Sequence, residues 1–310
     1  MEKEEQKFAK KSFIGELKLK KEDLNDYYKM KREYNYNNGR DITGIKLKEK
    51  VHPLILNLVK LQKKIIFKQS LTIIGDKRKP TNGPILYACT HTGRYDIENA
   101  MDAINDHCYL FMSDPETMYR TLDGAILNIN GVIFMDSYDK KDRKIAKLSA
   151  ENLLRKNGSL LIFPEGAWNL TENEVVMKLF PGTVDLALKT GAEIIPIAIE
   201  QYGNKYYANI GENISFINQD ENTDVKELSK NLRDAMATLR WEIWEKFPES
   251  RQNISENYSE KYINDILKEC QGYTIDDVNR DRFHDKNIVD ANEVFAFNNS
   301  EKQRVRTLSK

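Results

Sequence analysis

One short apolar run followed by a polar turn constrains this chain more than any other feature. Residues 85–89 read Ile-Leu-Tyr-Ala-Cys and are preceded by a Gly-Pro pair, which predicts a short buried β-strand. The strand ends just before His91, and a brief turn leads to Asp96, where a helix is expected to begin. His91 and Asp96 are therefore expected at the carboxyl end of a strand, the edge at which open α/β sheets bind ligands.

A histidine and an aspartate in this arrangement have a recognisable chemistry. A neutral imidazole oriented by a nearby carboxylate can take a proton from an alcohol. The His-x4-Asp spacing is a weak motif by itself, because the chain has 4 histidines and many acidic residues. Only His91 has this spacing, so its significance depends on the motifs that follow it.

The central part of the chain alternates predicted strands with predicted helices. Strands are expected at residues 71–74, 85–90, 109–112, 131–135, 159–163, 194–199, 206–210 and 214–217, the last two as a strand pair. Helices are expected at residues 51–68, 96–104, 118–127, 141–156, 183–190 and 225–247. This alternation is typical of an α/β fold with a mostly parallel sheet flanked by helices, here with an additional N-terminal helical segment.

Composition divides the 310 residues into one domain with extensions. Residues 1–50 form a polar, partly helical arm, and residues 51–70 contain an amphipathic basic helix. Residues 71–250 are the predicted α/β domain. Residues 251–310 are a polar, Asn-rich C-terminal extension with one expected helix at 256–270 and no recognisable chemistry.

The helix expected at residues 51–68 has two interpretations. Its apolar face is expected to contain Val51, Leu54, Leu58, Leu61 and Ile65, flanked by Ile55, Val59 and Ile66, with Lys60, Lys63, Lys64 and Lys68 opposite. The helix either packs on its own domain or lies in a membrane interface with its lysines near anionic headgroups.

Charge and cysteine content exclude several classes of function. The net charge is zero, which gives no general attraction to nucleic acid. The 3 cysteines are too few and too scattered for a disulfide framework or a zinc site, and they suit a reducing compartment. The N-terminus lacks a signal-peptide pattern, and no apolar stretch is long enough to span a membrane. We therefore expect a cytoplasmic protein, without a metal, that meets lipid only from the membrane surface.

A second motif follows the strand expected at residues 159–163. Phe-Pro-Glu-Gly at 163–166 delivers Glu165 to the carboxyl edge of the sheet, the edge expected for His91. A single acid after a strand is more often a cap or a surface residue. Here Glu165 is a candidate to bind hydroxyl groups of an acceptor or to stabilise a charged intermediate.

The order of these motifs resembles the glycerolipid acyltransferase family, typified by 1-acyl-glycerol-3-phosphate acyltransferase. That family has four blocks, Asn-His-x4-Asp, Gly-x-Ile-Phe-x-x-Arg, Phe-Pro-Glu-Gly-Thr-Arg-Ser and an apolar block around Val-Pro-Val. The corresponding residues here are Thr-His-x4-Asp at 90–96, Gly-Val-Ile-Phe-Met-Asp-Ser at 131–137, Phe-Pro-Glu-Gly-Ala-Trp-Asn at 163–169 and Ile-Ile-Pro-Ile at 194–197. The resemblance spans about residues 71–217 and, with four ordered blocks, is far more specific than any one motif.

The resemblance implies transfer of an acyl group from acyl-carrier protein or coenzyme A to a hydroxyl of a lysophospholipid-type acceptor, without a cofactor. His91 would be the general base, Asp96 would hold its tautomer, and Glu165 would help position the acceptor. An oxyanion would need backbone N–H donors, either near Gly131 or in the turn at 92–93. The expected partners are the acyl thioester and a lipid acceptor at the membrane surface, with no nucleic acid.

The resemblance also suggests substrate-binding residues, and two departures leave the acceptor open. The suggested residues are Arg94, Gly131, Phe134, Pro164, Gly166 and Trp168. Ser137 and Trp168 stand where the family has arginines associated with the acceptor's phosphate, and neither side chain reproduces a bidentate guanidinium. Arg94 is one alternative cation, and Lys178 or the group of Lys140, Lys141 and Arg143 is another; equally, the acceptor lacks a phosphomonoester. Trp168 is either a substrate contact or a partly buried loop residue.

Two other classes of function remain to be weighed. A degenerate relative that binds lipid or acyl-carrier protein without turnover would also retain these blocks. A hydrolase is poorly supported, because the Gly-x-Ser-x-Gly elbow is absent.

Overall fold

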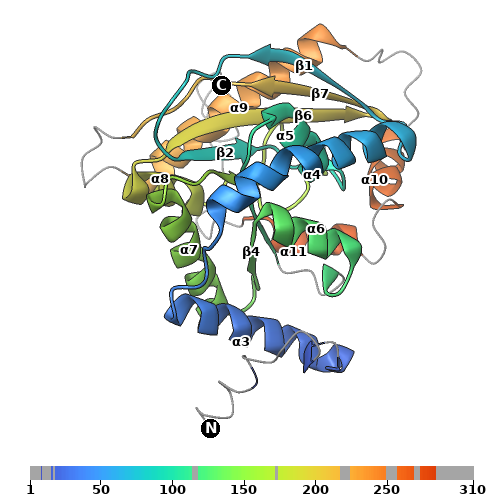
Figure 1. Ribbon diagram of the computed structural model, residues 1–310. Helices are drawn as coiled ribbons and strands as arrows, with labels where there is room; N and C mark the ends of the chain where they lie inside the picture. The colour runs from blue at the N-terminus through green and yellow to red at the C-terminus, as the bar shows by residue number, and fades with distance from the viewer. Residues whose placement is uncertain are drawn as a thin grey trace, which may run out of the picture.

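The computed structural model (Figure 1) describes residues 8, 15–16, 18–113, 118–171, 174–216, 224–248, 257–268 and 273–283. Its strands are β1 (Ser70–Asp76), β2 (Ile85–Cys89), β3 (Tyr109–Ser113), β4 (Val132–Met135), β5 (Leu160–Ile162), β6 (Glu193–Tyr202) and β7 (Lys205–Ile210). Its helices are η1 (Lys21–Asp23), α3 (Leu24–Asn37), α4 (Ile45–Ile65), α5 (Asp96–Ile104), α6 (Leu122–Asn130), α7 (Lys140–Arg155), α8 (Gly182–Thr190), α9 (Val225–Lys246), α10 (Tyr258–Lys268) and α11 (Ile275–Asp281).

These strands form one mixed sheet in the order β1-β7-β6-β2-β5-β3-β4. The strands from β6 to β4 in this order are parallel to their neighbours, whereas β7 runs antiparallel to β6 and β1 runs parallel to β7. The predicted fold class, a mostly parallel sheet flanked by helices with additional N-terminal helices, is confirmed.

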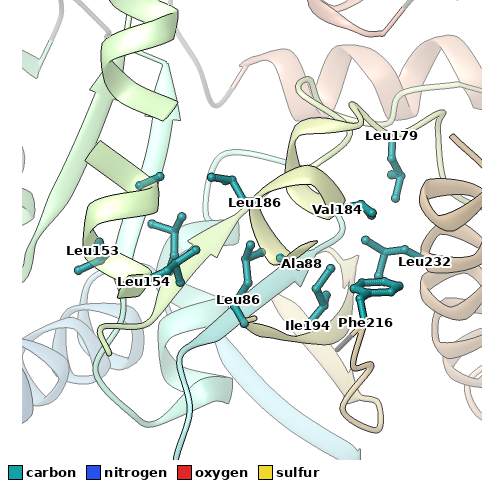
Figure 2. Close-up of a cluster of buried hydrophobic side chains, with 14 of the residues drawn as sticks. Leu86, Ala88, Leu153, Leu154, Leu179, Val184, Leu186, Ile194, Phe216 and Leu232 are labelled. Atoms are coloured by element: carbon teal, nitrogen blue, oxygen red, sulfur yellow. The ribbon is translucent and has the colours of Figure 1, made fainter. Parts of the chain in front are cut away.

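Helices cover both faces of the sheet, which explains why β2 is apolar along its whole length. Leu86 and Ala88 point to one side, into a core shared with α7, α8 and α9 (Figure 2). Tyr87 and Cys89 point to the other side, where they pack with α4 and α5. Both faces of the central strand β2 are thus buried in the core.

The register of the central strands places the motifs that follow them at one edge. Ala88 of β2 is opposite Ile162 of β5 on one side and opposite Pro196 of β6 on the other. Because the three strands are parallel, the residues that follow β2 and β5 leave the sheet at the same edge. The predicted proximity of His91 and Glu165 follows from this register.

The structure changes two predicted elements and agrees with a third. The helix expected at 118–127 begins later, as α6, because the Thr121 side chain accepts a hydrogen bond from Gly124 N and caps it. The predicted pairing of residues 206–210 with 214–217 is wrong: β7 pairs instead with β6 and β1, and Ile214 forms only an isolated bridge to Ile194. The helix expected at 256–270 is observed as α10, and residues 269–270 lie outside the described part of the chain.

Helix α4 packs on the domain and also exposes apolar side chains. It contacts α5 and α6 and crosses one face of the sheet (Figure 1), burying Ile55, Leu56 and Val59. Most of the predicted apolar face is nevertheless exposed, because the buried side is rotated relative to it: Leu54, Leu58, Leu61 and Ile65 are each more than half exposed. Lys63, expected on the polar side, is instead buried, with its Nζ 2.6 Å from Asp102 Oδ2.

None of the helices among the described residues combines the length and the hydropathy needed to cross a bilayer.

Candidate active site

The turn after β2 is built around the buried carboxylate of Asp96. This carboxylate accepts hydrogen bonds from the backbone N–H groups of Thr92 and Gly93, at 2.5 and 2.9 Å, and from the Thr92 hydroxyl at 2.8 Å. His91 Nδ1 lies 2.8 Å from Asp96 Oδ2. Because the Asp96 carboxylate can only accept hydrogen bonds, His91 Nδ1 must carry the proton in this pair. The other ring nitrogen, Nε2, is then the acceptor. The His91 side chain is 22% exposed, so the ring remains accessible.

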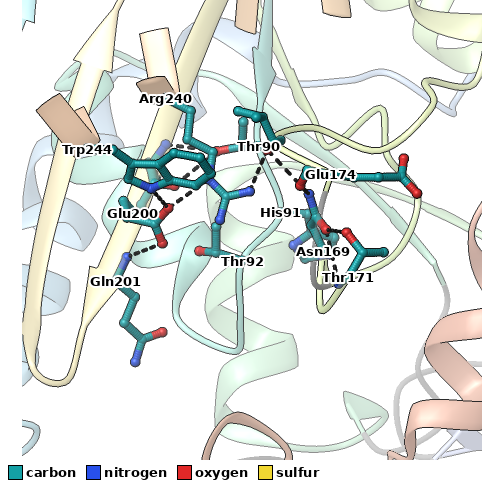
Figure 3. A network of polar contacts seen from close by, with 12 residues as sticks. Thr90, His91, Thr92, Asn169, Thr171, Glu174, Glu200, Gln201, Arg240 and Trp244 are labelled. Atoms are coloured by element: carbon teal, nitrogen blue, oxygen red, sulfur yellow. Dashed lines mark hydrogen bonds and ion pairs between the residues drawn. The ribbon is translucent and has the colours of Figure 1, made fainter. Parts of the chain in front are cut away.

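Both backbone groups of His91 are held by the loop that follows β5. The His91 N–H donates to Glu165 Oε1 at 2.9 Å. The His91 carbonyl accepts from the Asn169 N–H at 2.7 Å (Figure 3). The ring also stacks on Phe163, with centroids 4.5 Å apart. The imidazole is therefore fixed by its ring nitrogen, one ring face and its backbone.

Glu165 lies at the site, as its position after β5 predicts, but it is completely buried. Its second oxygen, Oε2, accepts from the Met177 N–H at 2.7 Å. Burial raises the pKa of Glu165 to about 7, opposed by the charge of Arg240 and by the two backbone donors. In this geometry Glu165 binds backbone from two loops and holds His91 in place.

A second buried network lies behind these loops and was missed by sequence reasoning. Arg240 Nε donates to Glu200 Oε2 at 2.7 Å, and Trp244 Nε1 donates to the same oxygen, also at 2.7 Å (Figure 3). Arg240 also donates to the Val175 carbonyl at 2.7 Å. Two signals were present: an acid at the end of a long apolar strand, and an Arg and a Trp four residues apart on one helix face.

Trp168 is buried beside His91. The two rings meet edge-on with centroids 6.2 Å apart, and Trp168 also packs edge-on against Tyr273, with centroids 4.9 Å apart. Only 9% of Trp168 is exposed. The residue therefore lies between the catalytic turn and the C-terminal helices.

Three other predicted substrate-binding residues lie near this site. Pro164 is buried, and its carbonyl accepts from the Phe180 N–H at 2.8 Å. Gly166 has a φ of +77°, and a Cβ added there would lie 2.3 Å from the Phe180 ring, so glycine is required. Arg94 is exposed, with its guanidinium 5.5 Å from the centre of the Tyr95 ring.

The structure does not bring Gly131 and Phe134 to His91. Both belong to the edge strand β4 or its start, and β5 and β3 separate β4 from β2. Gly131 precedes the parallel strand β4, so it lies at the edge of the sheet opposite the one that carries His91. Phe134 lines a separate cavity of about 530 Å³ that α3, α6 and α7 also border.

Both predicted sets of oxyanion donors are engaged elsewhere. The Gly131 N–H donates to the Leu127 carbonyl at 2.9 Å, which ends α6. The N–H groups of Thr92 and Gly93 donate to Asp96. Within the described residues, no group of three or more His, Cys, Asp or Glu side chains is arranged to hold a metal ion.

Comparison with known proteins relates part of this chain to one family. Residues 70–200 match the family model described as Acyltransferase. The 1-acyl-sn-glycerol-3-phosphate acyltransferase of Borreliella burgdorferi is 33% identical over 85 residues, which are 27% of this chain and 33% of that protein. The matched segment thus spans about a third of the relative's length.

A solved structure supports the same fold. The crystal structure of the 1-acyl-sn-glycerophosphate (LPA) acyltransferase, PlsC, from Thermotoga maritima matches with a TM-score of 0.52 and 16% identity. The match covers 66% of this chain and 84% of that one. The family model covers β1 through most of β6, and the first and third blocks meet at one edge of the sheet, so the comparisons support a relationship of this chain to the glycerolipid acyltransferase family.

Proposed function

We propose that this protein transfers a fatty acyl group from acyl-carrier protein or coenzyme A to a hydroxyl of a lysophospholipid-type acceptor. The observation that carries the proposal is the His91–Asp96 pair, with Nδ1 bound to a buried carboxylate and the ring partly accessible. The relative from Borreliella burgdorferi, named as a 1-acyl-sn-glycerol-3-phosphate acyltransferase, supports the reaction class.

The reaction follows from the orientation of the imidazole. His91 Nε2 takes the proton of the acceptor hydroxyl as its oxygen attacks the thioester carbonyl, and Asp96 stabilises the imidazolium that forms. The tetrahedral intermediate collapses with cleavage of the C–S bond, and the imidazolium returns the proton to the leaving thiolate. No covalent enzyme intermediate and no cofactor are required. Glu165 and Asn169 act through the backbone of His91, as positioning residues.

We also propose that the protein works at the cytoplasmic face of a membrane as a peripheral protein. The exposed side of α4 combines apolar residues with Lys46, Lys50 and Lys64. Leu122 and Ile129 of the neighbouring helix α6 are also more than half exposed and extend the apolar character. An apolar strip beside lysines is suited to the interface of an anionic bilayer, where a lipid acceptor resides.

The test of the reaction is transfer of a radiolabelled acyl group by the purified protein. Acyl-carrier protein and coenzyme A thioesters are offered with lysophosphatidate, other lysophospholipids and neutral glycolipids as acceptors. We expect His91→Asn to lower transfer at least about 10³-fold, because the amide can still donate to Asp96 but cannot act as a base.

The matched control is His107→Asn. His107 Nε2 donates to the Asn130 carbonyl at 2.8 Å and lies near the start of β3, at the edge of the sheet opposite His91. This variant should retain transfer if it folds. Equal transfer by wild type and His91→Asn would contradict the proposed mechanism. Lipid or carrier-protein binding without any transfer by the wild type would favour the alternative, a binding protein of the same fold.

A further inference from the structure

Helices α10 and α11 lie outside the segment that matches the family model, yet they pack on two of the motif blocks. We call residues 257–268 and 273–283, which contain α10 and α11, the cap. The cap's Ile266 and Val278 are buried in one apolar cluster with Ala167, Trp168 and Met177. The cap is therefore seated on the loop that follows β5, which also holds His91.

The cap also contacts the first block. If Gly93 carried a Cβ, that atom would lie 3.6 Å from the Ile266 side chain. Gly93 belongs to the turn whose backbone binds Asp96. Ile266 therefore packs directly on the turn that orients the catalytic pair.

Contacts with the second block are polar. The Tyr138 hydroxyl, just beyond Ser137, donates to Asp281 Oδ1 at 2.7 Å. Tyr273 donates to the other oxygen of Asp281 at 3.2 Å. Arg280 Nε lies 2.6 Å from the Tyr138 hydroxyl oxygen. Helix α11 of the cap is thus hydrogen-bonded to the loop that follows β4.

These contacts occupy the region where the family resemblance has phosphate-associated arginines. Trp168 takes one of those positions, and its indole contacts both the His91 ring and Tyr273 of the cap. Ser137, at the other position, adjoins the Tyr138 contact to Asp281. Trp168, which packs against Tyr273 of the cap, therefore fills space next to His91 that an acceptor headgroup would otherwise enter.

We propose that the cap is a wall of the acceptor site and that its seat on Trp168 restricts the acceptors to lysolipids with small headgroups. This inference rests on the proposed acyl transfer at His91. Trp168 anchors the cap and does not bind phosphate. Tyr273 and Ile266 are specificity-determining residues, since they place the cap against the catalytic turn.

The experiment compares two acceptors with the same acyl chain, lysophosphatidate and the bulkier lysophosphatidylcholine. The full-length wild type is compared with Tyr273→Ala and with Ile266→Ala. We expect each variant to raise the ratio of kcat/KM for the bulky acceptor to that for the small one by about tenfold, the usual effect of removing one pocket contact. Trp241→Ala, at a half-exposed tryptophan on α9, is the control and should leave the ratio unchanged.

Hydrogen exchange in residues 257–268 and 273–283 gives a readout that does not depend on catalysis. Exchange there should rise in Tyr273→Ala and Ile266→Ala and stay at the wild-type level in Trp241→Ala. If exchange rises but the ratio of kcat/KM for the two acceptors is unchanged, the cap has only a structural role, and the inference is overturned. Unchanged exchange would show that these residues do not seat the cap, with the same consequence.

Equilibrium binding of the same two lysolipids separates this inference from the proposed function. If the wild type transfers no acyl group but the variants bind the bulky lysolipid relatively better, the proposed reaction fails and the cap inference stands. If transfer occurs and neither the kinetic nor the binding ratio changes, the reaction stands and the cap inference fails.

Discussion

His91 is constrained at every polar atom except the one that would do chemistry. Its Nδ1 faces Asp96, its N–H faces Glu165, and its carbonyl accepts from Asn169. Nε2 is left to face a substrate. Such preorganisation matters because a general base must lie within hydrogen-bond reach of the proton it removes, and small displacements of the ring reduce the rate steeply.

Glu165 makes the stability of the protein depend on pH. Its pKa of about 7 in the folded chain lies above its ordinary value of 4.5, so between these pH values the folded chain binds the proton more strongly than the unfolded chain. The stabilisation is fully present below about pH 4.5 and is lost as pH rises through about 7.

We therefore expect the unfolding free energy of Glu165→Gln to depend less on pH than that of the wild type. From pH 4.5 to 7.5 the wild type should lose on the order of 3 kcal/mol of unfolding free energy relative to this variant, measured by urea denaturation. Glu212→Gln, at an exposed carboxylate, is the control and should follow the wild type. Parallel profiles for wild type and Glu165→Gln would show that the buried carboxyl does not titrate in this range.

Among the elements, α4 has two apolar sides with different roles. Ile55, Leu56 and Val59 pack on the sheet and α5, which fixes the helix to the domain. Leu58 and Leu61 are each 54% exposed and face away from it. Because an exposed leucine row of this length is unfavourable in water, a second surface is expected to cover it.

If that surface is a bilayer, acidic substitutions on the exposed side will weaken binding. We expect Leu58→Glu and Leu61→Glu each to lower the affinity for vesicles containing anionic phospholipid by about tenfold or more, since each buried leucine contributes about 1.5–3 kcal/mol. Vesicle co-sedimentation measures the change. Ile73→Glu, at a half-exposed residue of β1, should bind like the wild type. Undiminished binding by both leucine variants would argue against α4 as the membrane contact.

At the scale of the whole molecule, the Glu200–Arg240 pair joins the sheet to α9. Both side chains are about 95% buried, and Arg240 also reaches the loop at Val175, close to the segment that binds Glu165. A buried charge without its partner is strongly destabilising. This pair therefore couples the C-terminal half of the domain to the loop that positions His91.

Removal of the arginine should destabilise the fold as a whole. We expect Arg240→Met to lower the unfolding free energy by about 3–5 kcal/mol and a second change, Glu200→Gln, to recover much of the loss, because the amide still accepts from Trp244. Urea denaturation of the single and double variants measures this. Lys77→Met, in the exposed Lys77–Glu242 pair, should cost about 1 kcal/mol or less. A double variant no more stable than Arg240→Met would contradict the argument.

Local sequence determined the alternating strands and helices, the apolar strand β2 and the positions of His91, Asp96 and Glu165 at one edge of the sheet. These features depend on residues close together in the chain and on the rule that parallel strands share a carboxyl edge. The sequence also contains the four blocks in order, and these were sufficient to indicate a resemblance to the family.

Only the tertiary structure decided how the long-range contacts are made. The pairing of β7 with β6 and β1, the burial of Lys63 against Asp102, and the separation of β4 from β2 by two strands each depend on which segments become neighbours in space. The burial of Glu165 and the cap on Trp168 likewise join residues distant in the chain. Periodicity and turn chemistry describe a residue's immediate neighbours, whereas these contacts are chosen by the free energy of packing the whole chain.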